Sequence, residues 1–150
     1  MPDRKTMARA EHDRKQGKSA STQAGEFVKE EMDHIREGKH GARSAKQAIA
    51  IGLSKARRAG VDLPPPKAGT SEKTRRKAAR DTEAGHERKH RASATRSRAV
   101  TSALKKESRA TASKPALSRQ AHAAAGRRSA ASRSASARKA ARTRATHSTR

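Results

Sequence analysis

The chain has 150 residues, and its 38 lysine and arginine residues outnumber its 14 aspartate and glutamate residues to give a formal net charge of +24. Only 31% of the residues are hydrophobic, Phe27 is the single Phe, Tyr or Trp, and there is no cysteine, which excludes a disulfide framework and a thiolate metal site. Low hydrophobicity with high net charge is typical of chains that do not fold. We therefore expect a mostly disordered protein with a small all-α element.

The sequence also bears on location and partners. No apolar run reaches the roughly 18 residues of a membrane span, and the charged N-terminus lacks the apolar stretch of a secretory signal. We expect a cytoplasmic protein that does not bind membranes. A large excess of positive charge favours a polyanionic partner, so DNA is the expected partner and RNA the alternative.

The first part of the chain carries one predicted helix. Residues 1–19 are polar without apolar periodicity, so we expect a disordered arm. A helical pattern follows over residues 22–37, with Gly38 at the position of a C-cap. Its apolar residues share one face, and they are Ala24, Phe27, Val28, Met32 and Ile35.

A second helix is predicted over residues 44–60. Ser44 and Gln47 form an S-x-x-Q capping box, and Gly60 stands where such a helix ends. The two helices are expected to pair as a hairpin over about residues 22–60, inside a module of residues 20–63. Self-association or a protein partner is expected to support it, because its predicted core has only six large apolar side chains, Phe27, Val28, Met32, Ile35, Ile49 and Leu53.

The rest of the chain is predicted to be a cationic tail. Pro64–Pro66 breaks any helix, and residues 67–150 hold 24 basic and 5 acidic side chains, with no acid after Glu107. Alanine and arginine have high helix propensity. We expect a disordered tail over residues 67–150 that can become helical when it binds.

One segment resembles a known family. The run Gly38–Gly60, with K-Q-A-I-A-I-G-L-S at residues 46–54, is similar to a short bacterial domain of unknown function with the pattern K-Q-A-I-A-I-[AG]-L-S-x-A-R-[KR]-A-G. Gly52 stands where that family usually has alanine. The resemblance extends weakly over residues 26–38 and implies a fold and a bacterial origin, but no catalytic or binding residues. The Ala-, Arg- and Ser-rich tail separately resembles linker-histone-like tails in composition.

The charge pattern predicts sequence-independent DNA binding of a histone-like or nucleoid-associated kind. Each cation placed on a phosphate releases condensed counterions, whatever the base sequence. The chain lacks the aromatic platform of RRM and OB domains, and a helix-turn-helix would need a larger core. The alternatives are an RNA- or ribosome-associated protein and an adaptor whose helical head binds a protein. The predicted nucleic-acid-binding residues are Lys55, Arg57, Arg58, Arg75, Arg76, Lys77, Arg127, Arg128, Arg133, Arg138, Lys139, Arg142 and Arg144.

Metal binding and catalysis are not expected. His86 and His90 have the spacing of paired metal ligands on a helix, but Arg88, Lys89 and Arg91 surround them and no third ligand is evident. Carboxylates are few, and no Gly-rich phosphate loop is present. We therefore predict no enzyme activity, no metal site and no cofactor.

Overall fold

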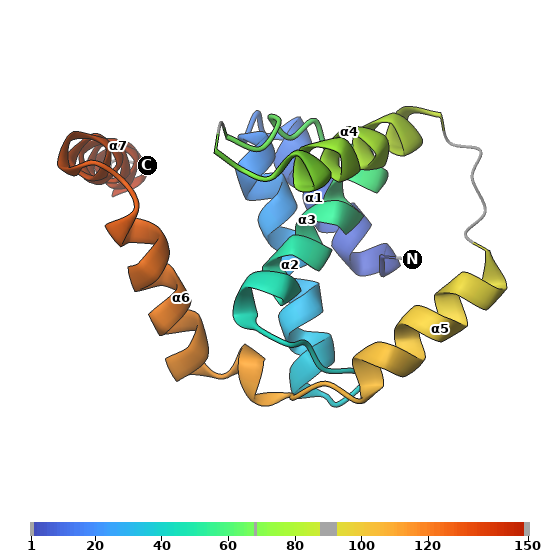
Figure 1. Cartoon of the computed structure of the whole chain (residues 1–150). Helices are drawn as coiled ribbons and strands as arrows, with labels where there is room; N and C mark the ends of the chain where they lie inside the picture. Colours follow the sequence, from blue (N-terminus) through green and yellow to red (C-terminus); the bar gives the residue numbers. More distant parts are fainter. Residues whose placement is uncertain (1, 68, 88–92, 149–150) are drawn as a thin grey trace. The chain divides into compact units, whose positions relative to one another are not determined.

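The computed structural model describes residues 2–67, 69–87 and 93–148, and these residues form seven α-helices and a short 3₁₀-helix (Figure 1). No strand occurs within these ranges, and none of their helices is long and apolar enough to cross a membrane. In chain order the elements are α1 (Arg4–Lys15), α2 (Ala20–Arg36), α3 (Ala45–Arg58), α4 (Glu72–His86), α5 (Ala94–Lys105), η1 (Ala110–Ala112), α6 (Lys114–Gly126) and α7 (Ala130–Ser148).

The prediction of a mostly disordered chain is wrong. The arm of residues 1–19 contains α1, and the described part of residues 67–150 contains four further helices. Composition misled the prediction because local helix signals need no large apolar side chains. Alanine and arginine favour helix, and serines cap two of these helices: Ser71 Oγ accepts a hydrogen bond from the Thr74 amide, and Ser93 Oγ accepts one from the Arg96 amide.

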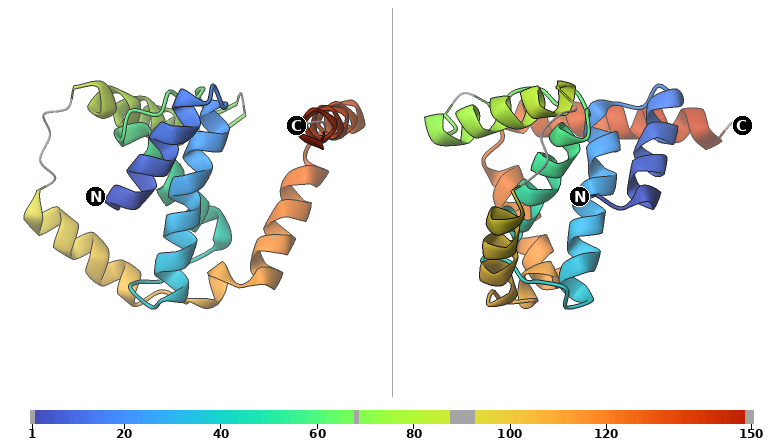
Figure 2. Two further views of the ribbon diagram at one scale, coloured as in Figure 1. Left: turned by 180° about the vertical axis from the view of Figure 1, so that it is seen from behind. Right: turned by 90° about the vertical axis from the view of Figure 1, so that its right-hand side faces the viewer.

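The chain divides into two compact units, Met1–Ser113 and Lys114–Arg150. In the first unit α1 and α3 pack on α2, α4 packs on α3, and η1 contacts both α2 and α3 (Figure 2). Pro64–Pro66 lies in the irregular connection between α3 and α4. The domain boundaries predicted at residues 19, 63 and 66 stay predictions.

The second unit consists of α6 and α7, which Arg127, Arg128 and Ser129 connect. Among its described side chains none is buried. Local hydrogen bonds and helix propensity therefore hold these two helices, because they have no apolar core.

α2 and α3 are the two helices that the apolar spacing predicts, and they pack against each other. Ser44 Oγ accepts a hydrogen bond from the Gln47 amide at 3.2 Å. The Gln47 side chain accepts one from the Arg43 amide at 2.8 Å, one residue before the position expected for a capping box. The start of α3 is thus capped from both sides.

The core of the first unit is built largely from small residues. Phe27, Met32 and Ile35 are buried as predicted, whereas Val28, Ile49 and Leu53 are only partly buried. The remaining buried apolar residues are Ala10, Ala24, Ala42, Ala45, Ala48, Ala56, Val61, Ala78 and Ala112. Because alanine lets helix backbones approach closely, a core forms here from few large side chains.

Candidate nucleic-acid interface

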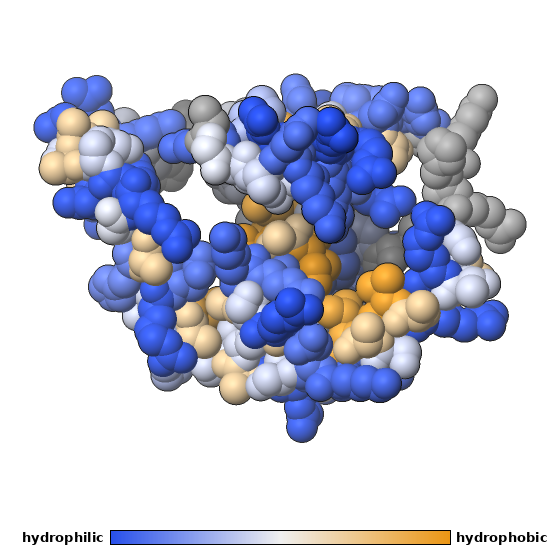
Figure 3. Space-filling model, viewed as in Figure 1, coloured by the Kyte–Doolittle hydropathy of each residue, from blue (hydrophilic) through white to orange (hydrophobic). Residues whose placement is uncertain are grey.

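The two sides of α4 differ, because one packs on α3 and the other is exposed and basic. Ala78 is buried, Asp81 accepts a hydrogen bond from Ser54 Oγ of α3 at 2.6 Å, and Gly85 lies against the α3 backbone. Helical geometry places the opposite face about 180° away. That face carries three exposed cations, Lys73, Arg76 and Arg80, here called the α4 basic face. The surface over α4 is correspondingly hydrophilic (Figure 3).

The predicted residues of α4 are exposed but differ in their surroundings. Arg76 belongs to the α4 basic face and forms an ion pair with Glu72 at 2.5 Å, whereas Lys77 is exposed but lies one turn before Asp81, beside the packed face. Arg75 instead lines a surface cavity of about 540 Å³, together with Arg57 and the Pro65–Pro66 segment. Lys73 and Arg80 were missed by sequence reasoning, although their helical spacing from Ala78 would have placed them.

Arg57 and Arg58 end α3, where the helix dipole favours positive charge. The Arg57 guanidinium donates a hydrogen bond to the Pro64 carbonyl at 3.3 Å, which ties α3 to the segment that follows. Arg58 is exposed. The structure therefore gives Arg57 a partner within the protein and leaves Arg58 at the surface.

Lys55 is held by two buried carboxylates of α2. Its Nζ lies 2.7 Å from Glu31 Oε2 and 3.1 Å from Glu30 Oε1, and Glu31 is 0% and Glu30 4% exposed. Burial lowers the pKa of Lys55, but the hydrogen bonds and charges of Glu31 and Glu30 outweigh it and raise the pKa above its usual value. The Lys55 charge is thus neutralised inside the protein, and we leave Lys55 out of the interface.

Glu30 is stabilised as a carboxylate from several sides. Burial raises its pKa, but hydrogen bonds from the Asp3 amide, Thr6 and Lys55, together with the Lys55 charge, lower the pKa below the usual value. The Asp3 amide donates to Glu30 Oε2 at 3.0 Å. This contact joins the start of α1 to the middle of α2.

α7 carries five exposed cations, and helical geometry distributes them around the helix rather than along one face. These residues are Arg133, Arg138, Lys139, Arg142 and Arg144. A helix of 19 residues is about 28 Å long. The second unit has ten basic residues and no acidic residue, so no acidic side chain of this unit neutralises them.

The arginines around the start of α7 have neutral partners. The Arg128 guanidinium donates to the Ser132 carbonyl at 2.9 Å and also to the hydroxyls of Ser132 and Ser136. Arg133 donates to the Arg128 carbonyl at 2.8 Å, and Arg127 is exposed. These bonds orient the guanidinium groups but leave their positive charge uncancelled.

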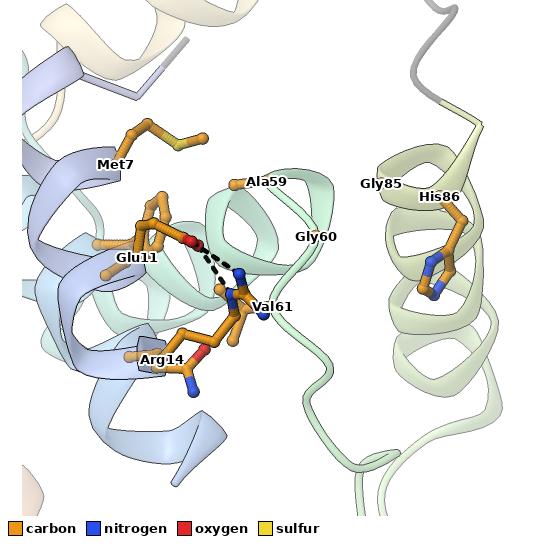
Figure 4. Close-up of a pocket in the computed structure, with 11 residues that line it drawn as sticks. Met7, Glu11, Arg14, Ala59, Gly60, Val61, Gly85 and His86 are labelled. Carbon is orange, nitrogen blue, oxygen red and sulfur yellow. Dashed lines mark hydrogen bonds and ion pairs between the residues drawn. The ribbon is translucent and has the colours of Figure 1, made fainter. Parts of the chain in front are cut away.

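A second cavity of the first unit, of about 410 Å³, lies between α1, the end of α3 and α4 (Figure 4). Arg14 donates two hydrogen bonds to Glu11 in its wall, at 2.7 and 2.8 Å, and His86 of α4 also lines it. No nucleophile with an adjacent base lines this cavity among the described residues. His90, the predicted partner of His86, lies outside the described residues.

Comparison with known proteins gives one result. Residues 3–67 match a family of unknown function (DUF6496). No curated protein and no solved structure matches the chain. The expected similarity to an uncharacterised domain is thereby confirmed.

The matched segment contains α1, α2 and α3 and ends just after Pro64–Pro66. Among the predicted nucleic-acid-binding residues only Lys55, Arg57 and Arg58 lie inside it. The α4 basic face and the whole second unit lie outside. The family match therefore carries no information about those cations.

Proposed function

We propose that the protein binds nucleic acid, principally DNA, through its phosphates and without reading base sequence. The second unit makes the main contact and the α4 basic face a second one. Such a protein would act in a histone-like manner at the nucleoid. The cationic surfaces that would make these contacts are helical, because the described part of residues 67–150 folds largely into helices.

The observation that carries the proposal is the charge of the second unit. Its ten basic residues face no acidic residue of the same unit, and the hydrogen-bond partners of Arg128, Arg133 and Arg144 are neutral oxygens. Phosphates are the partners that guanidinium groups bind best, through charge-assisted hydrogen bonds. A polyphosphate chain is therefore the partner that would best neutralise the positive charge of this unit.

The arrangement around α7 supports binding without sequence preference. Cations on every side of a helix can reach phosphates in many orientations, whereas base readout needs side chains fixed toward one groove. Alanine and serine fill the positions between the cations. They are too short to reach base edges past the arginines. Affinity should therefore follow the number of phosphate contacts.

The test compares two full-length variants of equal charge. In the first, Arg133, Arg138, Lys139, Arg142 and Arg144 are replaced by glutamine, which keeps helix propensity high. In the matched control, five exposed lysines of the first unit are replaced by glutamine, at Lys5, Lys15, Lys29, Lys46 and Lys67. Fluorescence anisotropy would be titrated on two unrelated duplexes and one structured RNA at several salt concentrations.

If about five α7 cations engage phosphates, their removal should reduce the slope of log affinity against log salt by about 4–5, while the control changes it little. Equal losses in the two variants would contradict a role for α7. A strong preference for one duplex would contradict sequence-independent binding. A large preference for the RNA would favour the RNA-associated alternative.

A further inference from the structure

Three side chains near the end of α2 bring metal-binding atoms together. Glu31 and His34 are separated by one helical turn, and His40 lies in the loop that follows α2. One ligand atom from each of the three lies within 4.8 Å of the others. Two imidazole nitrogens and one carboxylate oxygen form a ligand set that binds zinc in proteins.

The Glu31 carboxylate is fully buried and incompletely satisfied. Its Oε2 is paired with the Lys55 ammonium, whereas Oε1 accepts no hydrogen bond from any described residue. Oε2 has the Lys55 ammonium at 2.7 Å, whereas Oε1 has only the imidazole of His40, with Nε2 at 3.3 Å. Burying a carboxylate oxygen without a hydrogen-bond donor costs free energy. A cation bound at Oε1 would remove this cost.

The hydrogen bond of His40 Nδ1 indicates which of the two ring nitrogens carries the proton. Nδ1 lies 3.0 Å from the Gly41 carbonyl, which can only accept, so the proton sits on Nδ1. In the neutral imidazole Nε2 then points a lone pair at Oε1. The separation of 3.3 Å exceeds the roughly 2.7–2.9 Å of a charge-assisted hydrogen bond. Two ligands about 2.0–2.1 Å from a tetrahedral zinc ion lie about 3.3–3.4 Å apart.

The local charge is also suited to a divalent cation, although the whole chain is strongly basic. Asp3, Glu30 and Glu31 carry three negative charges against one positive charge on Lys55, and His34 and His40 are neutral when they act as ligands. The excess of two negative charges equals the charge of one such ion. The more distant cations are screened over about 8 Å at physiological salt.

We infer that Glu31, His34 and His40 bind one divalent transition-metal ion of the zinc class, with water in the fourth position. Lys55 holds the second oxygen of Glu31, and the Gly41 carbonyl orients His40, as outer-shell partners of metal ligands do. Asp3, 3.5 Å from His34 Nε2, lies beside this site and is largely exposed. Bound metal would fasten the loop after α2 to the helix.

The test uses the full chain after removal of metal with a chelator. Zn²⁺ would be titrated calorimetrically, and Co²⁺ would be added as a probe whose visible absorption reports tetrahedral coordination. We expect one Zn²⁺ per chain and a tetrahedral Co²⁺ spectrum. In the doubly substituted variant His34→Gln/His40→Gln, affinity should fall at least about 100-fold, whereas His122→Gln, outside the cluster, should bind like the native protein.

Thermal unfolding supplies a second readout. Saturating Zn²⁺ should raise the melting temperature of the native protein and leave that of the double variant unchanged, because only binding to the folded state stabilises it. Zn²⁺ binding by the native chain that is no tighter than about 1 mM would overturn the inference. So would a double variant that binds Zn²⁺ as tightly as the native chain.

Discussion

Gly52 lies where α3 comes close to α2. A Cβ atom at this position would stand 2.7 Å from Val28 Cα and 3.0 Å from Val28 N. Gly52→Ala would gain up to about 1 kcal/mol of helix propensity, but the α2 backbone would have to move. We expect a net decrease of about 1–3 kcal/mol in the free energy of unfolding, measured by chemical denaturation followed by circular dichroism.

Gly25 provides the matched control for this substitution. It lies inside α2, and a Cβ atom there would have no neighbour within 4 Å. Gly25→Ala should therefore raise the free energy of unfolding, by up to about 1 kcal/mol. A similar effect of alanine at both glycines would show that α2 and α3 do not approach each other as described.

Lys55 is the second residue whose surroundings decide its role. Replacing it in Lys55→Met leaves Glu30 and Glu31 buried without their cation, which should lower the free energy of unfolding by about 3–5 kcal/mol near neutral pH. Lys46→Met, at an exposed position of the same helix, should change it by less than about 0.5 kcal/mol. Equal effects in denaturation experiments would contradict the buried ion-pair cluster.

The same cluster predicts a pH dependence. The folded-state pKa of Glu30 is lowered, so its contribution to stability is present above about pH 4.5 and is lost as the pH falls further. The pKa of Lys55 is raised, so its contribution is complete below about pH 10.5 and is lost as the pH rises through the folded-state value.

In the Lys55→Met variant this acid dependence should reverse. Without the hydrogen bond and charge of Lys55, burial raises the pKa of Glu30, so acidification from about pH 7 to about pH 5 should raise the melting temperature of the variant. Thermal denaturation at a series of pH values measures this. A melting temperature of the variant that falls on acidification would argue against unpaired buried carboxylates.

At the scale of elements, the attachment of α4 depends on Gly85. A Cβ atom there would stand 2.1 Å from the Arg57 carbonyl oxygen, a backbone atom that cannot move without disturbing α3. In Gly85→Ala we expect α4 to separate from α3, with loss of amide-exchange protection over residues 72–86 and retention in α2 and α3.

Gly126→Ala serves as the comparison, because a Cβ atom at that glycine would have no neighbour within 4 Å. Its exchange pattern should match that of the native protein. Unchanged protection of α4 in Gly85→Ala would show that α4 is not packed on α3 through this glycine.

The helices differed in how far the sequence revealed them. Periodic apolar residues predict α2 and α3, because each buries one face against the other. α1 lacked such a pattern, and polar contacts help to position it: the Asp3 amide binds Glu30, and Arg9 pairs with Glu26. A search for apolar stripes does not detect a helix positioned by polar partners.

At the scale of the whole molecule, the charge of +24 should make folding sensitive to salt. Raising the ionic strength from about 10 mM to about 150 mM shortens the Debye length from about 30 Å to about 8 Å and weakens repulsion between like charges. We therefore expect helix content and melting temperature to rise with salt. The variant with five glutamines in α7 should respond less, and circular dichroism would measure both. A decrease of either quantity with salt would contradict this prediction.

The predicted cations of the candidate interface differ in whether their role could be predicted from charge runs alone. Most of the proposed phosphate-binding cations were identified from charge runs, because a long arginine side chain at the surface needs no particular fold to be exposed. Lys55 belonged to the same run but turned inward to Glu30 and Glu31, a pairing that depends on how α2 and α3 face each other.

The sequence by itself determined the charge excess, the two central helices, the Ser44 cap of α3, and the absence of an acidic residue after Glu107. These are properties of composition and of local spacing. Tertiary structure alone decided that α1 and α4 pack on the central helices and that Glu31, His34 and His40 meet. The physical reason is that close helix packing depends on small residues and on buried polar contacts between distant segments, which neither composition nor periodicity records.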